Sequence, residues 1–141
     1  MELLKTYLDA GLLGLLGFMS FLTLAFTVER YLFFARVELG SFRRVEDLEI
    51  ALTRHLTVIA TVGANAPYVG LLGTVLGILI TFHDMGQGGA IDTSTIMVGL
   101  ALALKATALG LLVAMPSIVF YNALLRRVDV LKARWGHRAN A

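Results

Sequence analysis

Residues 101–117 read ALALKATALGLLVAMPS, an almost wholly apolar run that contains one charged side chain, Lys105. The run belongs to a longer stretch, between Asp92 and Arg126, in which Lys105 is still the only charge. Roughly 20 apolar residues are enough for a helix to cross a bilayer. The stretch therefore predicts a membrane-spanning helix that carries one cation within the membrane.

Two other stretches have the same character. No charge interrupts residues 10–28, and none interrupts residues 56–82. A backbone exposed to lipid must satisfy its own hydrogen bonds, which favours helices. Charged residues make up only 16% of the chain, against about 25% in soluble proteins. The sequence predicts an all-α membrane protein, a single domain over residues 1–141, with transmembrane helices at about 10–34, 56–82 and 94–122.

The positions of the basic residues predict the orientation. The segment 30–54 and the C-terminal tail each contain five Lys or Arg residues, whereas the loop 83–92 contains none. Because Lys and Arg mark the cytoplasmic side, we expect the N-terminus outside the cytoplasm and the C-terminus in the cytoplasm. The first span continues into ERYLFFARV without a small-residue cleavage site, which favours a retained helix over a signal peptide. Leu48 and Leu52, set among charges, predict a short amphipathic helix near the membrane surface.

The composition argues against several classes of function. The chain has no cysteine, so it has no disulfide and no thiolate metal site. The segment GLLGTVLG lies in a predicted membrane helix with no strand before it, which is not the context of a phosphate-binding loop. A net charge of +2 is too small to indicate a nucleic-acid partner. We predict no enzymatic activity, no catalytic residue, no cofactor and no metal.

Small residues follow one face of the third predicted helix. They recur three or four positions apart, as a helical stripe requires: Gly99, Ala103, Ala106, Gly110, Ala114 and Ser117. The second helix carries Gly70, Gly73 and Gly77, and small residues let helices approach closely in lipid. Such faces serve either contacts between copies around a helix-lined centre or packing within one chain, and we expect a homo-oligomer. Pro67 and Pro116 lie inside the second and third helices, where proline can kink the chain.

Two threonines are candidates for an ion pathway. Thr74 shares a face of the second helix with Pro67 and Thr81, and Thr107 borders the stripe of the third helix. A threonine in a membrane helix commonly bonds only its own backbone. The position of both on the tightly packed faces favours a narrow polar ring that lines a pore.

Lys105 is a candidate functional charge. It lies thirteen residues after Asp92, roughly 20 Å along the helix axis, where a charge costs about 2.5–3.5 kcal/mol on insertion scales. It is also about 200° around the helix from Thr107, so the two occupy different faces. No acid is evident within the predicted spans. Lys105 either extends to the membrane surface at a subunit boundary or pairs with an acid from a partner protein or a neighbouring subunit.

Two motifs carry a resemblance to a known family. APYVGLLGTVLGI (66–78) and KATALGLLVAMPSIVFYN (105–122) closely resemble the second and third membrane helices of the ExbB/TolQ/MotA family of proton-channel subunits. The motifs and the loop between them cover about half of the chain. The three-span layout resembles the ExbB and TolQ branch more than the MotA branch, which has four spans and a large charged cytoplasmic domain.

The resemblance implies a homopentamer in the bacterial inner membrane, with two ExbD-like single-span helices in its central pore. An aspartate of that partner would carry protons, and the proton motive force would energise a TonB-like protein and hence TonB-dependent outer-membrane import. The family's pore threonines match Thr74 and Thr107. A TolQ-type role in outer-membrane integrity and a non-conducting membrane scaffold remain as alternatives.

The chain also departs from longer members of the family. Its first cytoplasmic loop and its outer N-terminus are much shorter. Many longer members carry a glutamate on the third helix where this chain has Leu102 or its neighbour, so no role of that glutamate transfers to this chain. Lys105 lies one turn further on, at roughly the same face, and we hypothesise that it takes over a charge-bearing position with the opposite sign.

Overall fold

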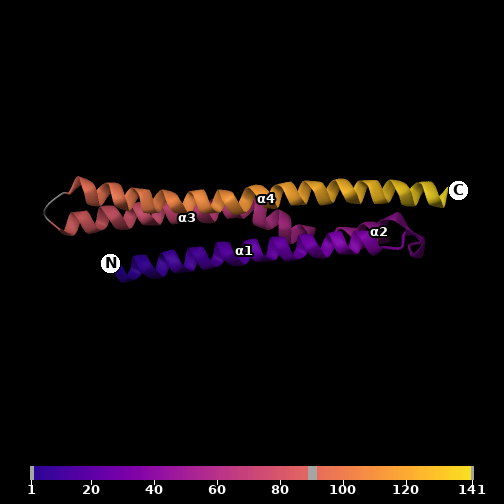
Figure 1. Ribbon diagram of the computed structural model, residues 1–141, viewed down its shortest axis with the longest axis horizontal. Coiled ribbons are helices and arrows are strands. Elements are labelled where there is room, and N and C mark those ends of the chain that lie inside the picture. Colours follow the sequence, from indigo (N-terminus) through magenta and orange to yellow (C-terminus); the bar gives the residue numbers. More distant parts are fainter. Residues whose placement is uncertain (1, 89–91, 141) are drawn as a thin grey trace.

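The computed structural model describes residues 2–88 and 92–140. Within them the chain forms, in order, α1 (Glu2–Arg36), the 3-10 helix η1 (Leu39–Ser41), α2 (Val45–Leu52), α3 (Leu56–Gln87) and α4 (Thr93–Ala139). The long helices α1, α3 and α4 lie side by side along the long axis, with the N-terminus near the end where α3 meets α4 (Figure 1). All three are long and apolar enough to cross a membrane, which confirms the predicted all-helical architecture with three spans.

The helices are longer than the spans predicted from the sequence. α1 begins at Glu2 instead of residue 10, and α4 continues to Ala139 instead of 122. At 47 residues, α4 measures roughly 70 Å, more than twice the ~30 Å hydrocarbon core, so it projects well beyond a membrane. α3 extends to Gln87, so the predicted loop 83–92 is in part helical, and its residues 89–91 lie outside the described residues. Both α3 and α4 continue through their prolines.

Local contacts explain where the helices begin. Asp92 precedes α4, and its carboxylate accepts hydrogen bonds from the Ser94 backbone N–H at 3.1 Å and the Thr95 hydroxyl at 3.0 Å. Such a cap satisfies backbone donors that have no partner in the first helical turn. At the other end of the molecule, His55 has a positive φ of 69° between α2 and α3. The chain turns there without glycine, and the His55 ring stacks on Phe26 of α1 at a centroid distance of 4.5 Å.

One apolar cluster joins all four α-helices at the end that contains the C-terminus. Leu48 and Leu52 of α2 are fully buried in it, whereas Ile50 is 70% exposed. The short amphipathic helix predicted for this segment is therefore confirmed, with its apolar face against the long helices. The cluster consists of Phe34, Leu48, Leu52, Leu56, Ile59, Leu124, Val128 and Leu131.

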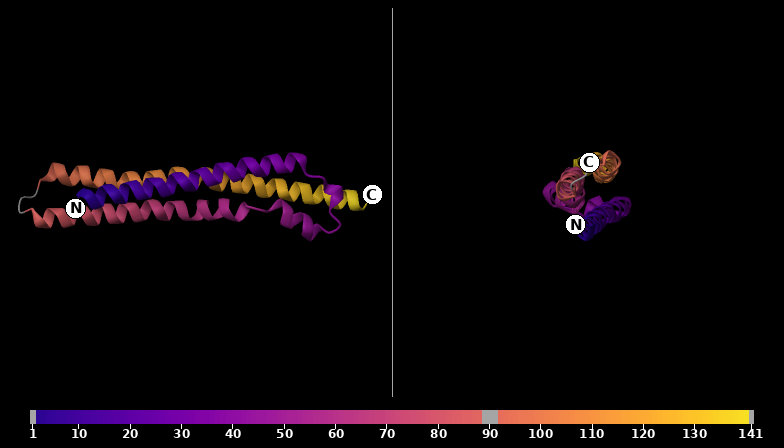
Figure 2. Two further views of the ribbon diagram at one scale, coloured as in Figure 1. Left: turned by 90° about the horizontal axis from the view of Figure 1, so that it is seen from below. Right: turned by 90° about the vertical axis from the view of Figure 1, so that its left-hand side faces the viewer.

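A second cluster lies nearer the middle of the molecule, where α1 packs over α3 and α4. Leu16 and Met19 of α1 meet Val62 and Ala66 of α3 and Ala114 of α4. The end-on view shows α1 on one side of the α3–α4 pair (Figure 2). This arrangement divides the surface of the pair into a side that α1 covers and a side that it leaves open.

Candidate functional site: a hydroxyl pair between α3 and α4

Two glycines bring the backbones of α3 and α4 into direct contact. A methyl group on Gly110 would lie 2.6 Å from the carbonyl oxygen of Ala66, and one on Gly70 would lie 2.7 Å from the carbonyl oxygen of Ala106. Carbon atoms do not approach oxygen so closely without displacing it. Glycine is therefore required at both positions of this crossing.

The contact continues along both helices. A methyl group on Gly73 would meet Ala106 of α4 and Leu12 of α1, and one on Gly77 would meet Ala103. At Gly99 the neighbour is the side chain of Thr81. The sequence leaves two uses open for these small residues, contacts between copies or packing within one chain, and the structure shows the second. Two long antiparallel helices in close contact need small residues at every turn, so the stripe gives no argument for an oligomer.

The two candidate threonines meet at this crossing, 33 residues apart in the sequence. Thr74 is 8% exposed, and its Oγ1 contacts the Oγ1 of Thr107 directly. The carbonyl of Ala103 lies 2.9 Å from the Thr74 hydroxyl. The Gly70 carbonyl lies 3.3 Å from the Thr74 hydroxyl and 3.4 Å from the Thr107 hydroxyl.

The chemistry of this pair is that of a small proton-exchanging network. Each hydroxyl supplies one hydrogen and accepts through two lone pairs. The two hydrogens of Thr74 and Thr107 are shared among two backbone carbonyls and the two hydroxyl oxygens. Acceptors outnumber hydrogens, so each hydroxyl can change its partner by rotation alone. The bond to the helix's own backbone is one of these options and does not exclude the others.

The hydroxyl pair faces away from α1. Gly73 and Ala106 contact one another on the side where Leu12 of α1 packs. Thr74 and Thr107 each follow those residues by one position, about 100° further around their helices. Because α3 and α4 run antiparallel and the two threonines touch, both rotations lead to the side of the pair that α1 leaves open. Thr107 is partly exposed there.

Lys105 lies on the opposite side, as the angular spacing predicts. It lines a narrow groove of about 70 Å³ between α1 and α4, together with Leu102 of α4 and Leu12 and Asp9 of α1. Asp9 lies just outside the predicted first span, and it lines the same groove as Lys105. α1 begins earlier than the predicted span and runs parallel to α4 (Figure 1), which places its first turns alongside Lys105. Among the described residues, Asp9 and Lys105 form no ion pair within 4 Å.

Two other polar contacts of α1 are not predicted from the sequence. The Ser117 hydroxyl donates to the Thr23 hydroxyl at 3.1 Å, in a buried contact between α4 and α1. Arg30 is only 2% exposed and donates to the carbonyls of Ala51 at 2.7 Å and Leu52 at 3.3 Å, at the end of α2. In the sequence, Arg30 looks like any arginine at the cytoplasmic end of a membrane span. Its buried contacts with α2 therefore could not be predicted.

The fold and the site define a multi-pass helical membrane protein in which a pair of membrane-embedded hydroxyls joins two spans. The MotA/TolQ/ExbB proton channel family matches residues 37–137. The chain belongs to this family.

Similar proteins include members named for two different systems. The chain is 51% identical over 135 residues to the biopolymer transport protein ExbB of Helicobacter pylori, with 96% of this chain and 93% of that protein covered. It is 56% identical over 135 residues to ExbB of Aquifex aeolicus, covering 96% and 91%. The Tol-Pal system protein TolQ of Pseudomonas aeruginosa is 40% identical over 87 residues, covering 62% of this chain and 38% of that protein.

Proposed function

We propose that this chain is the proton-channel subunit of an inner-membrane motor. In this function several copies, five by analogy with the family, surround a central pore that holds two single-span helices of an ExbD-like partner. Proton flow through the pore energises a TonB-like protein and, through it, import across the outer membrane. The N-terminus lies in the periplasm and the C-terminus in the cytoplasm, as the distribution of basic residues indicates.

The observation that carries the proposal is the direction in which the hydroxyl pair faces. Thr74 and Thr107 touch each other on the open side of the α3–α4 pair, opposite the side that Leu12 of α1 covers. If copies assemble with α1 outermost, the hydroxyls converge around a shared axis lined by α3 and α4. A non-conducting scaffold has no need for two hydroxyls on that side.

The pathway combines groups of this chain with a group of the partner. A carboxylate on the partner helix takes up a proton from a protonated water molecule and leaves neutral water, and the hydroxyls of Thr74 and Thr107 hold that water molecule by donating or accepting as required. In the proposed passage the two hydroxyls form a polar step between apolar parts of the two helices. Lys105 faces α1 and lies outside this passage, where it sets the local charge instead of carrying protons.

A threonine double variant tests the proposal. We expect Thr74→Val with Thr107→Val to abolish proton uptake by proteoliposomes that contain the chain and its single-span partner, because valine keeps the shape and removes both hydroxyls. The assembly, measured by its size in detergent, should not change. The control is Thr61→Val, since Thr61 is exposed on the same helix and bonds only the carbonyl of Thr57. Unchanged proton uptake in the double variant would refute the proposed channel function and would favour the non-conducting scaffold.

The TolQ-type role is the second candidate, favoured by the 40% identity to a TolQ protein. The identities of 51% and 56% to ExbB proteins extend over nearly the whole chain, which makes ExbB the better analogy. Deletion of the gene separates the two functions. Loss of TonB-dependent uptake with intact detergent resistance supports the ExbB role, and the reverse supports the TolQ role.

A further inference from the structure

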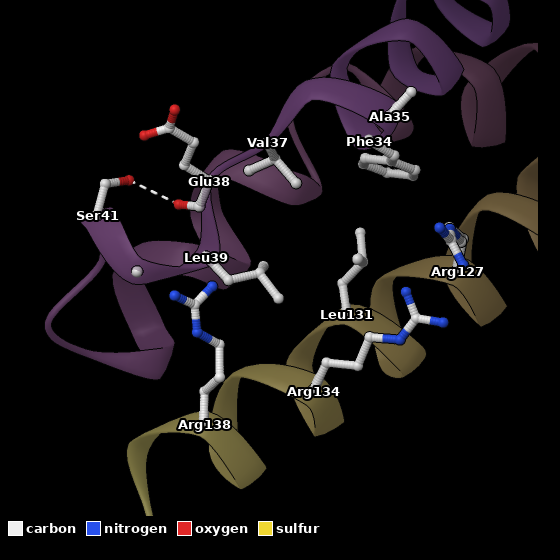
Figure 3. A pocket seen from close by; sticks show the side chains of 11 residues that line it. Phe34, Ala35, Val37, Glu38, Leu39, Ser41, Arg127, Leu131, Arg134 and Arg138 are labelled. Carbon is white, nitrogen blue, oxygen red and sulfur yellow. Dashed lines mark hydrogen bonds between the residues drawn. The ribbon is translucent and has the colours of Figure 1, made fainter. Parts of the chain in front are cut away.

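A hollow lies away from the hydroxyl pair, at the C-terminal end of the molecule. It has a volume of about 650 Å³, within the range of small-molecule sites. The end of α1, η1 and the last turns of α4 form its walls. Figure 3 shows Arg127, Arg134 and Arg138 of α4 along one wall together with Leu131, and Phe34 and Val37 on the facing wall.

Within residues 2–88 and 92–140, no carboxylate lies within 4 Å of these three guanidinium groups. The ion pairs within the described residues involve other cations, namely Arg30, Arg44, His83 and Lys132. Glu38 lines the pocket as well, but its carboxylate points away from the arginines (Figure 3). Like charges along one helix face repel one another, so an anion in the pocket would be stabilised. Arginine suits phosphate in particular, because its planar fork of donors matches two phosphate oxygens.

Two of the arginines form one end of the pocket. Figure 3 shows the guanidinium groups of Arg127 and Arg134 together at that end, whereas Arg138 extends beside Leu39 at the other end. The Arg138 guanidinium nitrogen lies 3.3 Å from where a methyl group on Gly40 would be, so it packs against η1 and closes the far wall. Arg127 and Arg134 are therefore the pair available to an anion.

The depth of this end matches the headgroup layer of a membrane. Arg126 and Arg127 are the first charges on α4 after Lys105, so Arg127 marks the limit of the apolar span. Arg134 lies seven residues beyond, roughly 10 Å along the axis, but a long side chain on a helix points back toward the N-terminus. The two guanidinium groups thus meet within the headgroup layer, which is roughly 5–8 Å deep on each side of the hydrocarbon core.

We infer that this pocket binds the headgroup of an anionic phospholipid from the leaflet at the basic end of the molecule. Arg127 and Arg134 hold the phosphate, while Phe34, Val37 and Leu131 contact the glycerol and the first methylenes of the acyl chains. An acidic protein segment would match the charges, but it would leave the apolar surface at the membrane boundary unused. The inference rests on the membrane placement proposed above and is independent of proton conduction.

Native mass spectrometry of the detergent-purified protein tests this site. The probes are phosphatidylglycerol and phosphatidylcholine with identical acyl chains. We expect the wild type to retain phosphatidylglycerol in preference to phosphatidylcholine, and Arg127→Gln with Arg134→Gln to weaken that binding about tenfold, since each basic side chain near an anionic headgroup contributes appreciably. The matched control is Arg36→Gln with Arg126→Gln, which removes the same charge from two exposed positions outside the pocket.

Each outcome decides for or against the site. If the two double variants retain equal amounts of phosphatidylglycerol, the assignment is overturned and the pocket remains open to an acidic protein segment. Equal retention of the two lipids by the wild type would also overturn it. Should the pocket double variant fail to fold, the single variant Arg127→Gln against Arg126→Gln provides the same comparison. The measurement needs no partner and no proton gradient, so the proposed channel function could fail while this inference holds.

Discussion

Gly11, Gly14 and Gly17 of α1 have no atom within 4 Å of the position that a methyl group would take, whereas the same position on Gly70 and Gly110 collides with backbone atoms. Glycines recur every three residues in α1, and Gly70, Gly73 and Gly77 recur every three or four residues in α3. In α3 and α4 they permit backbone contact, and in α1 they face open space. A glycine pattern in a membrane helix therefore identifies a face that can be approached closely, without showing that anything approaches it.

The two regions are also held together differently. α3 and α4 join through backbone contact at the glycines and through the Thr74–Thr107 hydroxyls. α1 joins that pair through large side chains, Leu16 and Met19, and through the bond from Ser117 to Thr23. Backbone contact tolerates almost no change, whereas side-chain packing can adjust. We conclude that α3 and α4 form the rigid part of the molecule and α1 the more adaptable part.

The largest effect is expected when a methyl group is added to a glycine of the α3–α4 contact and, for comparison, to a glycine of α1. We expect Gly110→Ala to lower the free energy of unfolding by about 3 kcal/mol, the upper end of the range for overpacking, because the obstacle is backbone. Gly14→Ala should raise it by roughly 0.5–1 kcal/mol, since alanine favours a helix over glycine. Helicity during titration with SDS in mixed micelles measures both, and effects of the same sign would contradict the comparison.

The next effect concerns Arg30, which ties α1 to the end of α2. Arg30→Gln should lower the free energy of local opening of α2 by about 2 kcal/mol, since it removes charged hydrogen bonds to the carbonyls of Ala51 and Leu52. Amide hydrogen exchange over residues 45–56 measures this opening. Arg36→Gln, at an exposed position of the same helix, should leave the exchange unchanged. Equal protection in both variants would show that Arg30 does not hold α2.

A smaller change should follow removal of the hydroxyl bond between α1 and α4. Ser117→Ala should cost about 0.6 kcal/mol, the average for hydrogen bonds between membrane helices. Thr23→Val should cost a similar amount, and the double variant little more than either, because both remove the same bond. The SDS titration resolves these values as a double-mutant cycle. Fully additive losses would mean that the bond does not couple the two helices.

The smallest effect on stability is expected at Lys105, which lies exposed in the groove beside Asp9. Lys105→Met should leave the assembly intact and change the free energy of unfolding by less than about 1 kcal/mol, because Lys105 is exposed and even a surface ion pair contributes no more than that. It should nevertheless impair motor function, measured as TonB-dependent uptake in cells. Asp9→Asn should then impair uptake to a similar extent. Full activity of Lys105→Met would show that the charge of Lys105 has no role in motor function.

Much of the architecture follows from the order of residues alone. The three spans, the short helix over residues 45–52 and the separation of Lys105 from Thr107 all follow from apolar length and helical periodicity, which depend only on neighbours in the chain. The ends of α1 and α4 cannot be read from the sequence. Charged residues limit the apolar spans, but a helix can continue past them when neighbouring helices pack against it. The position of Asp9 in the groove with Lys105 does not follow either, since it depends on how α1 packs against α4.

Only the packing of the helices settles which small and polar residues meet. The sequence contains the hydroxyls of Thr74 and Thr107, the charge of Arg30 and the glycine stripes, but each has a plausible solitary role within its own helix. In the structure the two threonines meet on the side away from α1, the small residues of α3 and α4 pack against each other within the chain, and Arg30 is buried at the end of α2. These are contacts between residues far apart in the chain, and they depend on the relative rotation of helices, which no pattern along a single helix contains.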